Sequence, residues 1–478
     1  MLSERARPAR VRKHRHAPWF AVAAVCVGAF MGQLDASVVT LIFPSLQRGF
    51  HAPLAAVQWV ALAYLLTVIA LLAGAGRLAD VAGRKLVYLQ GFAVFTAASA
   101  ACGFASSLPV LVGSRVAQAV GAAMLQANSV ALVVTSVPPR RARAALGAQA
   151  AAQSLGLAVG PLAGGLVVGL AGWRWVFWIN VPVGLAAIVA GRYLLPRTRA
   201  RVRGGAFDVI GLVLLAGAAT VLLLAVSAVS GLGWPSWVIA VLLAAGAASA
   251  LGLWRWERRA AVPLIDAAVV GGGAVAAGLA GALCGYLVLF GPLVLVPQVL
   301  VAAGLSESHA GAVLSALPAG FAVAALTADH LLPRRWGNRP RCLAGALIAA
   351  TAAGAATIAP VTPGPLAACL GLLGAGLGLF VPANNAAVMA VVPARMSATV
   401  GGLINMARGM GTALGIAAVT LALFTTARSP TTGTRIALAG LGFAALVAAL
   451  TAALPPRSRA SQPGTVAGGE RGRPGPLA

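Results

Sequence analysis

Two charged residues, Asp35 and Arg115, lie inside long apolar runs, where an ionised side chain is unfavourable. A charge at the centre of a membrane helix costs roughly 2.5 to 3.5 kcal/mol on insertion scales, so such groups usually face the interior of a helix bundle and pair. A carboxylate there could exchange protons or contact a cationic substrate. The alternatives are that Asp35 is hydrated near the outer interface, and that Arg115 extends its side chain to the headgroups.

The depths of these two residues in the membrane are compatible with direct contact. With 1.5 Å of rise per residue, Asp35 lies about 25 Å from the cytoplasmic start of its helix, and Arg115 lies about 10 Å from the outer start of its own. Both therefore fall in the outer half of the membrane. We expect them to be partners.

The segment from Gly76 to Lys85 reads G-R-L-A-D-V-A-G-R-K and places four charges in the short connection between two apolar runs. Its glycines permit a tight turn. The carboxylate could act on nearby helix N-termini, and the basic side chains could pair with it or with anionic lipid. The alternative is a purely topogenic role for the positive charges. The residues of this predicted cytoplasmic gate are Gly76, Arg77, Asp80, Gly83, Arg84 and Lys85.

Glycine recurs every fourth residue along the fifth apolar run. Small residues at this spacing line one helix face and let another backbone come close, and a proline removes one backbone hydrogen bond and can bend the helix. Close packing alone would explain the pattern, but in a transporter the same contact could act as a hinge or seal. The residues concerned are Gly156, Gly160, Pro161, Gly164 and Gly165.

Further polar residues also lie within apolar runs. Each could line a cavity, or could bond across helices for well under 2 kcal/mol. The candidate cavity-lining residues are Gln118, Gln126, Asn128, Gln153, Asn405 and Arg408.

The composition is that of a membrane protein. Of 478 residues, 60% are apolar and 9% are charged, against roughly 25% charged residues in a soluble domain. The formal net charge of +26 could suggest nucleic-acid binding, but the basic residues are scattered in small clusters between apolar runs, which argues against it. The five cysteines occur singly, without metal-ligand spacing, so we expect neither a metal site nor a cofactor.

The apolar runs are long enough to cross a bilayer, which takes roughly 20 residues each. We therefore expect an all-α polytopic membrane protein with fourteen transmembrane helices. The predicted spans are 18–43, 54–75, 86–105, 108–136, 144–171, 174–195, 208–230, 236–255, 273–301, 309–332, 341–360, 364–393, 397–425 and 434–454.

The distribution of lysine and arginine orients these spans, because both residues are biased to the cytoplasmic side. With a cytoplasmic N-terminus, 29 of the 35 basic residues fall in cytoplasmic segments and four fall outside. One miscounted span would reverse the assignment downstream and destroy the pattern. We therefore expect both termini in the cytoplasm.

The segments between the spans hold no soluble stretch long enough to fold alone. This excludes a fused enzyme and leaves transport, scaffolding or sensing as functions. The tail from Pro455 onward is rich in proline, glycine, serine and arginine, and we expect it to be disordered.

Several motifs in the N-terminal half, taken together and in this order, resemble the drug:proton antiporters of the major facilitator superfamily, in their fourteen-helix branch. They are L-D-A-S-V-V in the first span, Gln58-Trp59 and Tyr64-Leu65-Leu66 in the second, the Gly76 to Lys85 segment, Arg115 with Gln118 in the fourth, Gly160-Pro161 with Gly164-Gly165 in the fifth, and W-R-W-V-F-W-I-N-V-P-V-G from Trp173 to Gly184.

The resemblance implies a major-facilitator fold with two six-helix bundles around a central cavity and two inserted helices. It also implies alternating access about a midplane site, with proton coupling at Asp35 and Arg115. The implied organisation is a basic cytoplasmic tail (1–17), an N-terminal six-helix bundle (18–195), a cytoplasmic linker with two extra transmembrane helices (196–260), a C-terminal six-helix bundle (261–454) and a disordered cytoplasmic tail (455–478).

The expected function is proton-coupled efflux of hydrophobic small molecules such as drugs, antibiotics or secondary metabolites. Arginine outnumbers lysine 33 to 2, which indicates a GC-rich bacterial genome and hence a bacterial plasma membrane. The expected partners are a hydrophobic or monocationic substrate, protons and anionic lipids, and the chain is expected to act as a monomer. The alternatives are proton-coupled uptake of a small metabolite and a non-transporting membrane sensor.

Overall fold

A computed structural model describes residues 8, 14–138, 141–197, 209–229, 234–259, 273–333, 335–392, 397–426 and 429–453, and the regular structure in these ranges is helical. The helices are α2 (Ala17–Leu41), α3 (Phe43–Phe50), α4 (Leu54–Val57), α5 (Trp59–Ala82), α6 (Arg84–Gly103), α7 (Leu108–Ser136), α8 (Ala142–Ala171), α9 (Trp175–Trp178), α10 (Asn180–Leu194), α11 (Val209–Ser227), α12 (Ser236–Glu257), α14 (Ala274–Ala302), α15 (Glu307–Leu314), α16 (Ala316–Leu331), α17 (Asn338–Ile358), α18 (Pro363–Ala390), α19 (Ser397–Thr425) and α20 (Pro430–Ala453).

Helices are the structure that these apolar segments can adopt in a membrane. Lipid offers no hydrogen bonds, so every backbone N–H and C=O of a lone segment must be bonded within it, as in a helix. In the described ranges, thirteen helical spans are long and apolar enough to cross a membrane. The fourteenth predicted span, 208–230, corresponds to α11, a helix of 19 residues without a charged side chain. The predicted all-α polytopic fold class is confirmed.

Three predicted spans consist of a short helix followed by a long one: α4 with α5, α9 with α10, and α15 with α16. The residues between them, Gln58, Ile179 and Ser315, keep right-handed helical backbone angles. Each pair is therefore one slightly interrupted span. The first span is similar, since α2 is followed after Ile42, also right-handed helical, by the short helix α3, which is capped by His51 with a left-handed backbone.

The connection predicted at Gly76 to Lys85 is much shorter than expected. Helix α5 continues to Ala82 and α6 begins at Arg84, so Gly83 alone separates them. Its φ of 110° belongs to a region that glycine adopts more readily than other residues, which allows a one-residue turn. The apolar run ends at Ala75 but the helix does not, because leucine, alanine and arginine favour helix beyond the hydrocarbon as well.

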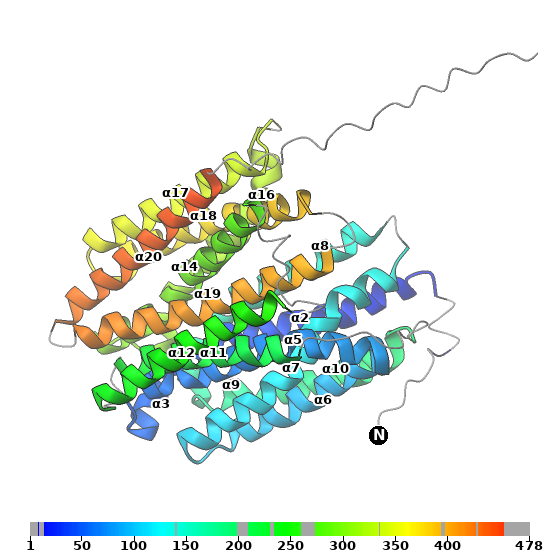
Figure 1. Cartoon of the computed structure of the whole chain (residues 1–478), viewed down its shortest axis with the longest axis horizontal. Helices are drawn as coiled ribbons and strands as arrows, with labels where there is room; N and C mark the ends of the chain where they lie inside the picture. The colour runs from blue at the N-terminus through cyan, green and yellow to red at the C-terminus, as the bar shows by residue number, and fades with distance from the viewer. Residues whose placement is uncertain are drawn as a thin grey trace, which may run out of the picture.

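The long helices run side by side along a common direction and form two groups (Figure 1). In the first group, α2 packs on α8, α5 on α7, and α6 on both α7 and α10. In the second, α16 and α17 pack on α18, α14 on α19, and α17 on α20. In Figure 1 the first group is coloured blue to green-cyan and the second light green to red, and below they are called the first half and the second half.

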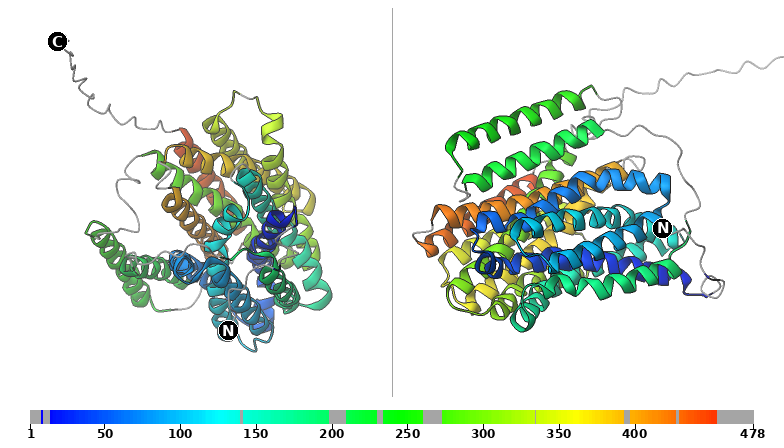
Figure 2. Two further views of the ribbon diagram at one scale, coloured as in Figure 1. Left: turned by 90° about the vertical axis from the view of Figure 1, so that its right-hand side faces the viewer. Right: turned by 90° about the horizontal axis from the view of Figure 1, so that it is seen from below.

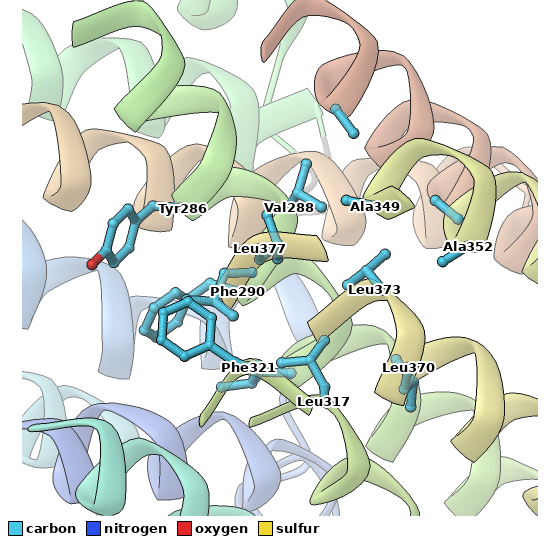
Figure 3. Close-up of a cluster of buried hydrophobic side chains, with 14 of the residues drawn as sticks. Tyr286, Val288, Phe290, Leu317, Phe321, Ala349, Ala352, Leu370, Leu373 and Leu377 are labelled. Atoms are coloured by element: carbon cyan, nitrogen blue, oxygen red, sulfur yellow. The ribbon is translucent and has the colours of Figure 1, made fainter. Parts of the chain in front are cut away.

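Apolar clusters hold each half together and also join the two. One cluster fills the second half and includes Tyr286, Phe290 and Phe321 (Figure 3). Another contains Ile42 at the end of α2 together with Val294 of α14 and other residues from both halves. The halves are therefore in apolar contact at the end of the molecule that carries α3.

Helices α11 and α12 lie at the edge of the bundle, as the right-hand view of Figure 2 shows. Helix α11 contacts α5 and α19, whereas α12 packs on α11, and none of the residues of α12 is buried. An apolar helix with so little protein around it requires lipid around the rest of its surface.

Three predicted segments lie mostly or wholly outside the described ranges. They are the basic tail 1–17, the part of the linker at 198–208, and the tail 455–478.

Candidate functional site

Asp35 and Arg115 are in direct contact inside the first half. An N–H of the Arg115 guanidinium in α7 donates to Oδ2 of Asp35 in α2 over 2.6 Å. Asp35 is 3% exposed and Arg115 is 1% exposed. The pairing predicted from their depths is therefore present, and neither side chain extends to water or to the headgroups.

Gln118 joins this ion pair into a network. Its amide nitrogen donates to Oδ1 of Asp35 at 3.1 Å and to the Ser99 hydroxyl at 2.7 Å, and its carbonyl oxygen accepts from Arg115 at 2.6 Å. Asn180 donates to the same Asp35 oxygen at 3.3 Å. All five side chains are buried, and they come from α2, α6, α7 and α10.

Ser99 and Asn180 were not among the residues predicted for the site. Asn180 could have been found, because it belongs to the W-R-W-V-F-W-I-N-V-P-V-G segment that carried part of the resemblance. Ser99 gave no such signal, since a serine in an apolar helix commonly bonds to its own backbone.

The remaining surface of the Arg115 guanidinium is also satisfied. Its Nε–H donates to the backbone carbonyl of Val60 at 3.0 Å. Its carbon lies 4.1 Å from the centroid of the Tyr64 ring and 5.8 Å from that of Phe177, which favours a cation at this place. A buried ion pair with such contacts is costly to break from one side, because the partner left behind is an unpaired charge.

A cavity of about 30 Å³ borders Asp35 and Asn180, and its other walls are apolar side chains of α2, α8 and α9. One water needs roughly 10 to 15 Å³ of such volume and polar partners. The cavity therefore has room for a water beside the carboxylate.

Three glycines of the predicted motif, Gly156, Gly160 and Gly164, face α2. A Cβ on each would meet an atom of that helix; at Gly160 this is the hydroxyl of Ser37 and at Gly164 a methyl of Val38. The glycine face therefore brings α8 against the helix that carries Asp35.

Gly165 faces the second half instead. A Cβ at this position would lie 2.9 Å from the carbonyl oxygen of Glu307 and 3.3 Å from the Cα of Gly311, both in α15. A Cβ on Gly311 would in turn meet the carbonyl of Pro161. The motif therefore has two faces, one within the first half and one between the halves.

Polar contacts join the halves at the same end of the molecule. Arg48 of α3 pairs with Glu307 of α15, which also accepts a hydrogen bond from Ser45 at 2.9 Å. Gln298 of α14 donates to Gln47 of α3 at 2.7 Å. The sequence placed Arg48 and Glu307 on the same predicted side, but their distance along the chain left the pairing unpredicted.

The predicted gate segment contains one interaction that the sequence did not predict. Lys85, for which pairing with Asp80 or anionic lipid was expected, is 0% exposed and donates at 2.8 Å to the backbone carbonyls of Arg192 and Leu195. Burial keeps its ammonium away from lipid headgroups. The side chains of Arg77 and Asp80 lie outside the described part.

The remaining gate residues are at the ends of α5 and α6. Gly76 lies within α5, where a Cβ would make ordinary contact with Ala127 at 3.9 Å. Arg84 is the half-buried first residue of α6. Lys85 therefore ties the start of α6 to the end of α10, which fixes one end of the first half.

The candidate cavity-lining residues have different surroundings. Gln118 belongs to the Asp35 network, and Asn128 is buried and bonds the Met124 carbonyl of its own helix at 2.8 Å. The more accessible ones are Gln126 and Asn405, which are exposed, and Gln153 and Arg408, which are half-buried.

The network is centred on the charge of Asp35. The Asp35 carboxylate accepts hydrogen bonds from three side chains. Loss of that charge would weaken its bond to Arg115. One carboxylate therefore takes part in contacts among four helices.

Comparison with known proteins assigns the family. The model of the Major Facilitator Superfamily matches residues 25–207 and 200–416. The tetracenomycin C resistance and export protein of Streptomyces glaucescens is 33% identical over 389 residues, which are 81% of this chain and 72% of that protein. The riboflavin transporter RibZ of Clostridioides difficile is 30% identical over 382 residues, 78% of this chain and 81% of that protein.

A solved structure supports the fold. The crystal structure of a bacterial homologue of the human lysosomal transporter Spinster, in an inward-facing and unoccupied conformation, matches with a TM-score of 0.66 at 16% identity. The match covers 92% of this chain and 97% of that one. The chain therefore belongs to the major facilitator superfamily, and it is a multi-pass membrane transporter rather than an enzyme.

Proposed function

We propose that this transporter exports hydrophobic small molecules, such as drugs, antibiotics or secondary metabolites, in exchange for protons. The observation that carries the proposal is Asp35, a carboxylate buried inside a span and held by Arg115 and Gln118. A residue of this kind is costly in a membrane and marks a proton or substrate path. The name of the Streptomyces glaucescens relative, a resistance and export protein, supports export as the direction.

The proposed cycle uses the two states of Asp35. Protonation from outside weakens the ion pair with Arg115 and loosens α2 against α7, and release of the proton to the cytoplasm restores the pair. Each proton that enters down a potential of 100 mV releases roughly 2.3 kcal/mol. That is enough for one proton to support a substantial concentration gradient of an exported compound.

In the proposed alternating-access cycle, the two halves move relative to each other. We equate these halves with the predicted bundles 18–195 and 261–454. The structure has the halves closed against each other where α3 meets α15. The arginine distribution places this end outside and both termini in the cytoplasm. In the proposal, this closed end opens once in each cycle to release cargo.

Uptake of a small metabolite is the second candidate. It rests on the relative named as a riboflavin transporter, since a related chain can carry a cargo that is not a toxic compound. Both candidates share the fold and the Asp35 network, so they differ in direction and cargo.

The test replaces Asp35 by asparagine, which keeps the shape of the side chain and removes its charge. A panel of toxic hydrophobic compounds first identifies one to which expressing cells become resistant. Purified protein in liposomes with an internal pH-sensitive dye then reports proton flux driven by that compound. We expect Asp35→Asn to lose this flux and Glu470→Gln, a matched change in the C-terminal tail, to keep it. Full flux in Asp35→Asn would remove the coupling role, and flux coupled to uptake would select the second candidate.

A further inference from the structure

Arg408 is a second arginine inside a span, and it lies deep in the membrane. It is about 16 Å along the axis from the start of α19, and Tyr286 is about 18 Å from the start of α14. Both helices are predicted to begin on the cytoplasmic side. The two residues are therefore at the same depth, near the middle of the bilayer.

The Arg408 side chain points into the protein. Its guanidinium carbon lies 4.7 Å from the centroid of the Tyr286 ring, and one N–H donates to the Asn405 side-chain oxygen at 3.1 Å. Tyr286 is 8% exposed, whereas Arg408 is half-buried and Asn405 is exposed. The guanidinium therefore lies between Asn405, one turn earlier on its own helix, and the Tyr286 ring of α14.

The charge of Arg408 differs from that of Arg115 in having no carboxylate partner among the described residues. Within the described part of the chain, no carboxylate lies at salt-bridge distance from Arg408, while Asp35 and Glu307 are taken by Arg115 and Arg48. An unpaired cation at this depth is unfavourable. It becomes favourable when an anionic or strongly accepting group of a ligand binds beside it.

Tyr286 fixes the position of the Arg408 guanidinium. Its ring is stacked with Phe290, at 6.3 Å between centroids and 20° between planes, and the two rings are only 8% and 3% exposed. Figure 3 shows Tyr286 at the edge of the aromatic and leucine-rich cluster of the second half, with its hydroxyl directed away from the labelled leucines. A ligand would therefore meet the half-buried guanidinium and the exposed Asn405 rather than the faces of these rings.

We propose that Arg408 and Asn405, with Tyr286 packed against the guanidinium, form a substrate subsite for a carboxylate, phenolate or enolate oxygen of the cargo. The proposal rests on the proposed function, because it names the cargo class of the same transporter. The guanidinium and the Asn405 amide donate to the oxygen, and the Tyr286 ring holds the guanidinium in place. The proposal favours an anionic over a monocationic cargo, since Asp35 and Glu307 are already paired.

A structural role is the competing explanation. The contact between Arg408 and Tyr286 could serve to hold α19 against α14, since cation–π contacts are attractive. In that case a change at Arg408 would lower stability equally for the empty and the loaded protein, and it would not alter the choice between ligands.

The experiment measures equilibrium binding to purified full-length protein in detergent, without a proton gradient. Three probes share one hydroxyanthraquinone body and differ in one group: a carboxylate, a carboxamide or a trimethylammonium. The variants are Arg408→Gln, Arg408→Lys and Tyr286→Phe. Arg435→Gln, an exposed arginine of α20, is the matched control.

We expect the wild-type protein to prefer the carboxylate probe over the carboxamide by about tenfold or more, as for a charge-assisted hydrogen bond. Arg408→Gln should abolish that preference, Arg408→Lys should keep part of it, and Arg435→Gln should leave it intact. Equal affinity for the three probes, or tightest binding of trimethylammonium, would overturn the proposal. So would an Arg408→Gln protein with a lower Tm but an unchanged preference. Because no gradient is present, loss of proton coupling in the Asp35 test does not affect this result.

Discussion

The hydroxyl of Ser308 in α15 donates a hydrogen bond to the backbone carbonyl of Gly165 in α8, 2.9 Å away. This bond crosses from one half of the transporter to the other. It is possible because neither Gly165 nor Gly311 has a side chain to keep the two backbones apart. The closed end of the molecule therefore includes a close approach of two backbones, which the proposed transport cycle must open and close.

Gly165→Ala should weaken this closure. The new Cβ would lie 2.9 Å from the Glu307 carbonyl, closer than a carbon can rest, so α8 and α15 must separate. Spin labels at His51 and Ala303, in a background without the five native cysteines, should report a longer distance. Gly113→Ala is the matched control, because nothing lies within 4 Å of its Cβ position. An unchanged distance in Gly165→Ala would show that the seal does not depend on this glycine.

Glu307→Gln should favour separation of the same halves, but weakly. Arg48 is 63% exposed, and exposed ion pairs contribute about 0.2 to 1 kcal/mol, so the population of separated molecules should rise at most a few-fold. Higher salt should have a similar effect on the wild-type protein, because it screens the pair. The exchanged variant Arg48→Glu with Glu307→Arg should regain part of the closure. A salt response that persists in Glu307→Gln would assign it to other charges.

Gln118→Leu should destabilise the protein by about 1 to 3 kcal/mol, the cost of leaving buried polar groups unbonded. The leucine can neither accept from Arg115 nor donate to Asp35 and Ser99. Thermal unfolding in detergent should give a clearly lower Tm. Gln126→Leu on the same helix is the control, since Gln126 is exposed and its Tm should stay close to that of the wild type. Equal Tm values for both variants would mean that the network contributes little to stability.

Combining Asp35→Asn with Arg115→Gln should be less destabilising than either change alone. Each single change leaves one buried charge without its partner, at a cost of about 3 to 5 kcal/mol, whereas the double change removes both charges. Thermal unfolding of the four proteins gives the coupling between the two sites. If the stability losses of the two single variants add up in the double variant, the surrounding groups, and not the partner, stabilise each charge. The double variant should still lack proton-coupled transport.

Transport of an anionic cargo should be electrogenic. One anion leaving and one proton entering move two charges in the same direction, about 2.3 kcal/mol each per 100 mV, whereas a monocation exchanged for a proton moves none. In liposomes, a potential set by potassium and valinomycin, positive on the side that the cargo enters, should therefore accelerate efflux of a carboxylate compound. A rate independent of the potential would show that the compound does not cross as an anion in exchange for a proton, and would count against the subsite at Arg408.

The sequence by itself determined the class of molecule. Apolar runs of membrane-spanning length predicted helices because a lone backbone in lipid can satisfy its hydrogen bonds in few other ways. The cost of a buried charge singled out Asp35 and Arg115, and the rise per residue placed them at compatible depths. These arguments use local pattern and length, which a sequence displays directly.

The tertiary structure decided which side chains meet. Ser99 and Asn180 are hydrogen-bonded within the Asp35 network. Lys85 donates to backbone carbonyls at the end of α10 instead of reaching lipid. Arg48 pairs with Glu307, which is more than half the chain away in sequence. Gly165 faces α15, while its neighbour Gly164 faces α2. Such contacts depend on the rotation of each helix about its axis, where one residue turns a side chain by about 100° at 3.6 residues per turn. An apolar run shows where a helix lies along the chain. The sides of a membrane helix that face lipid and protein are similarly apolar, so the sequence does not show which side faces which.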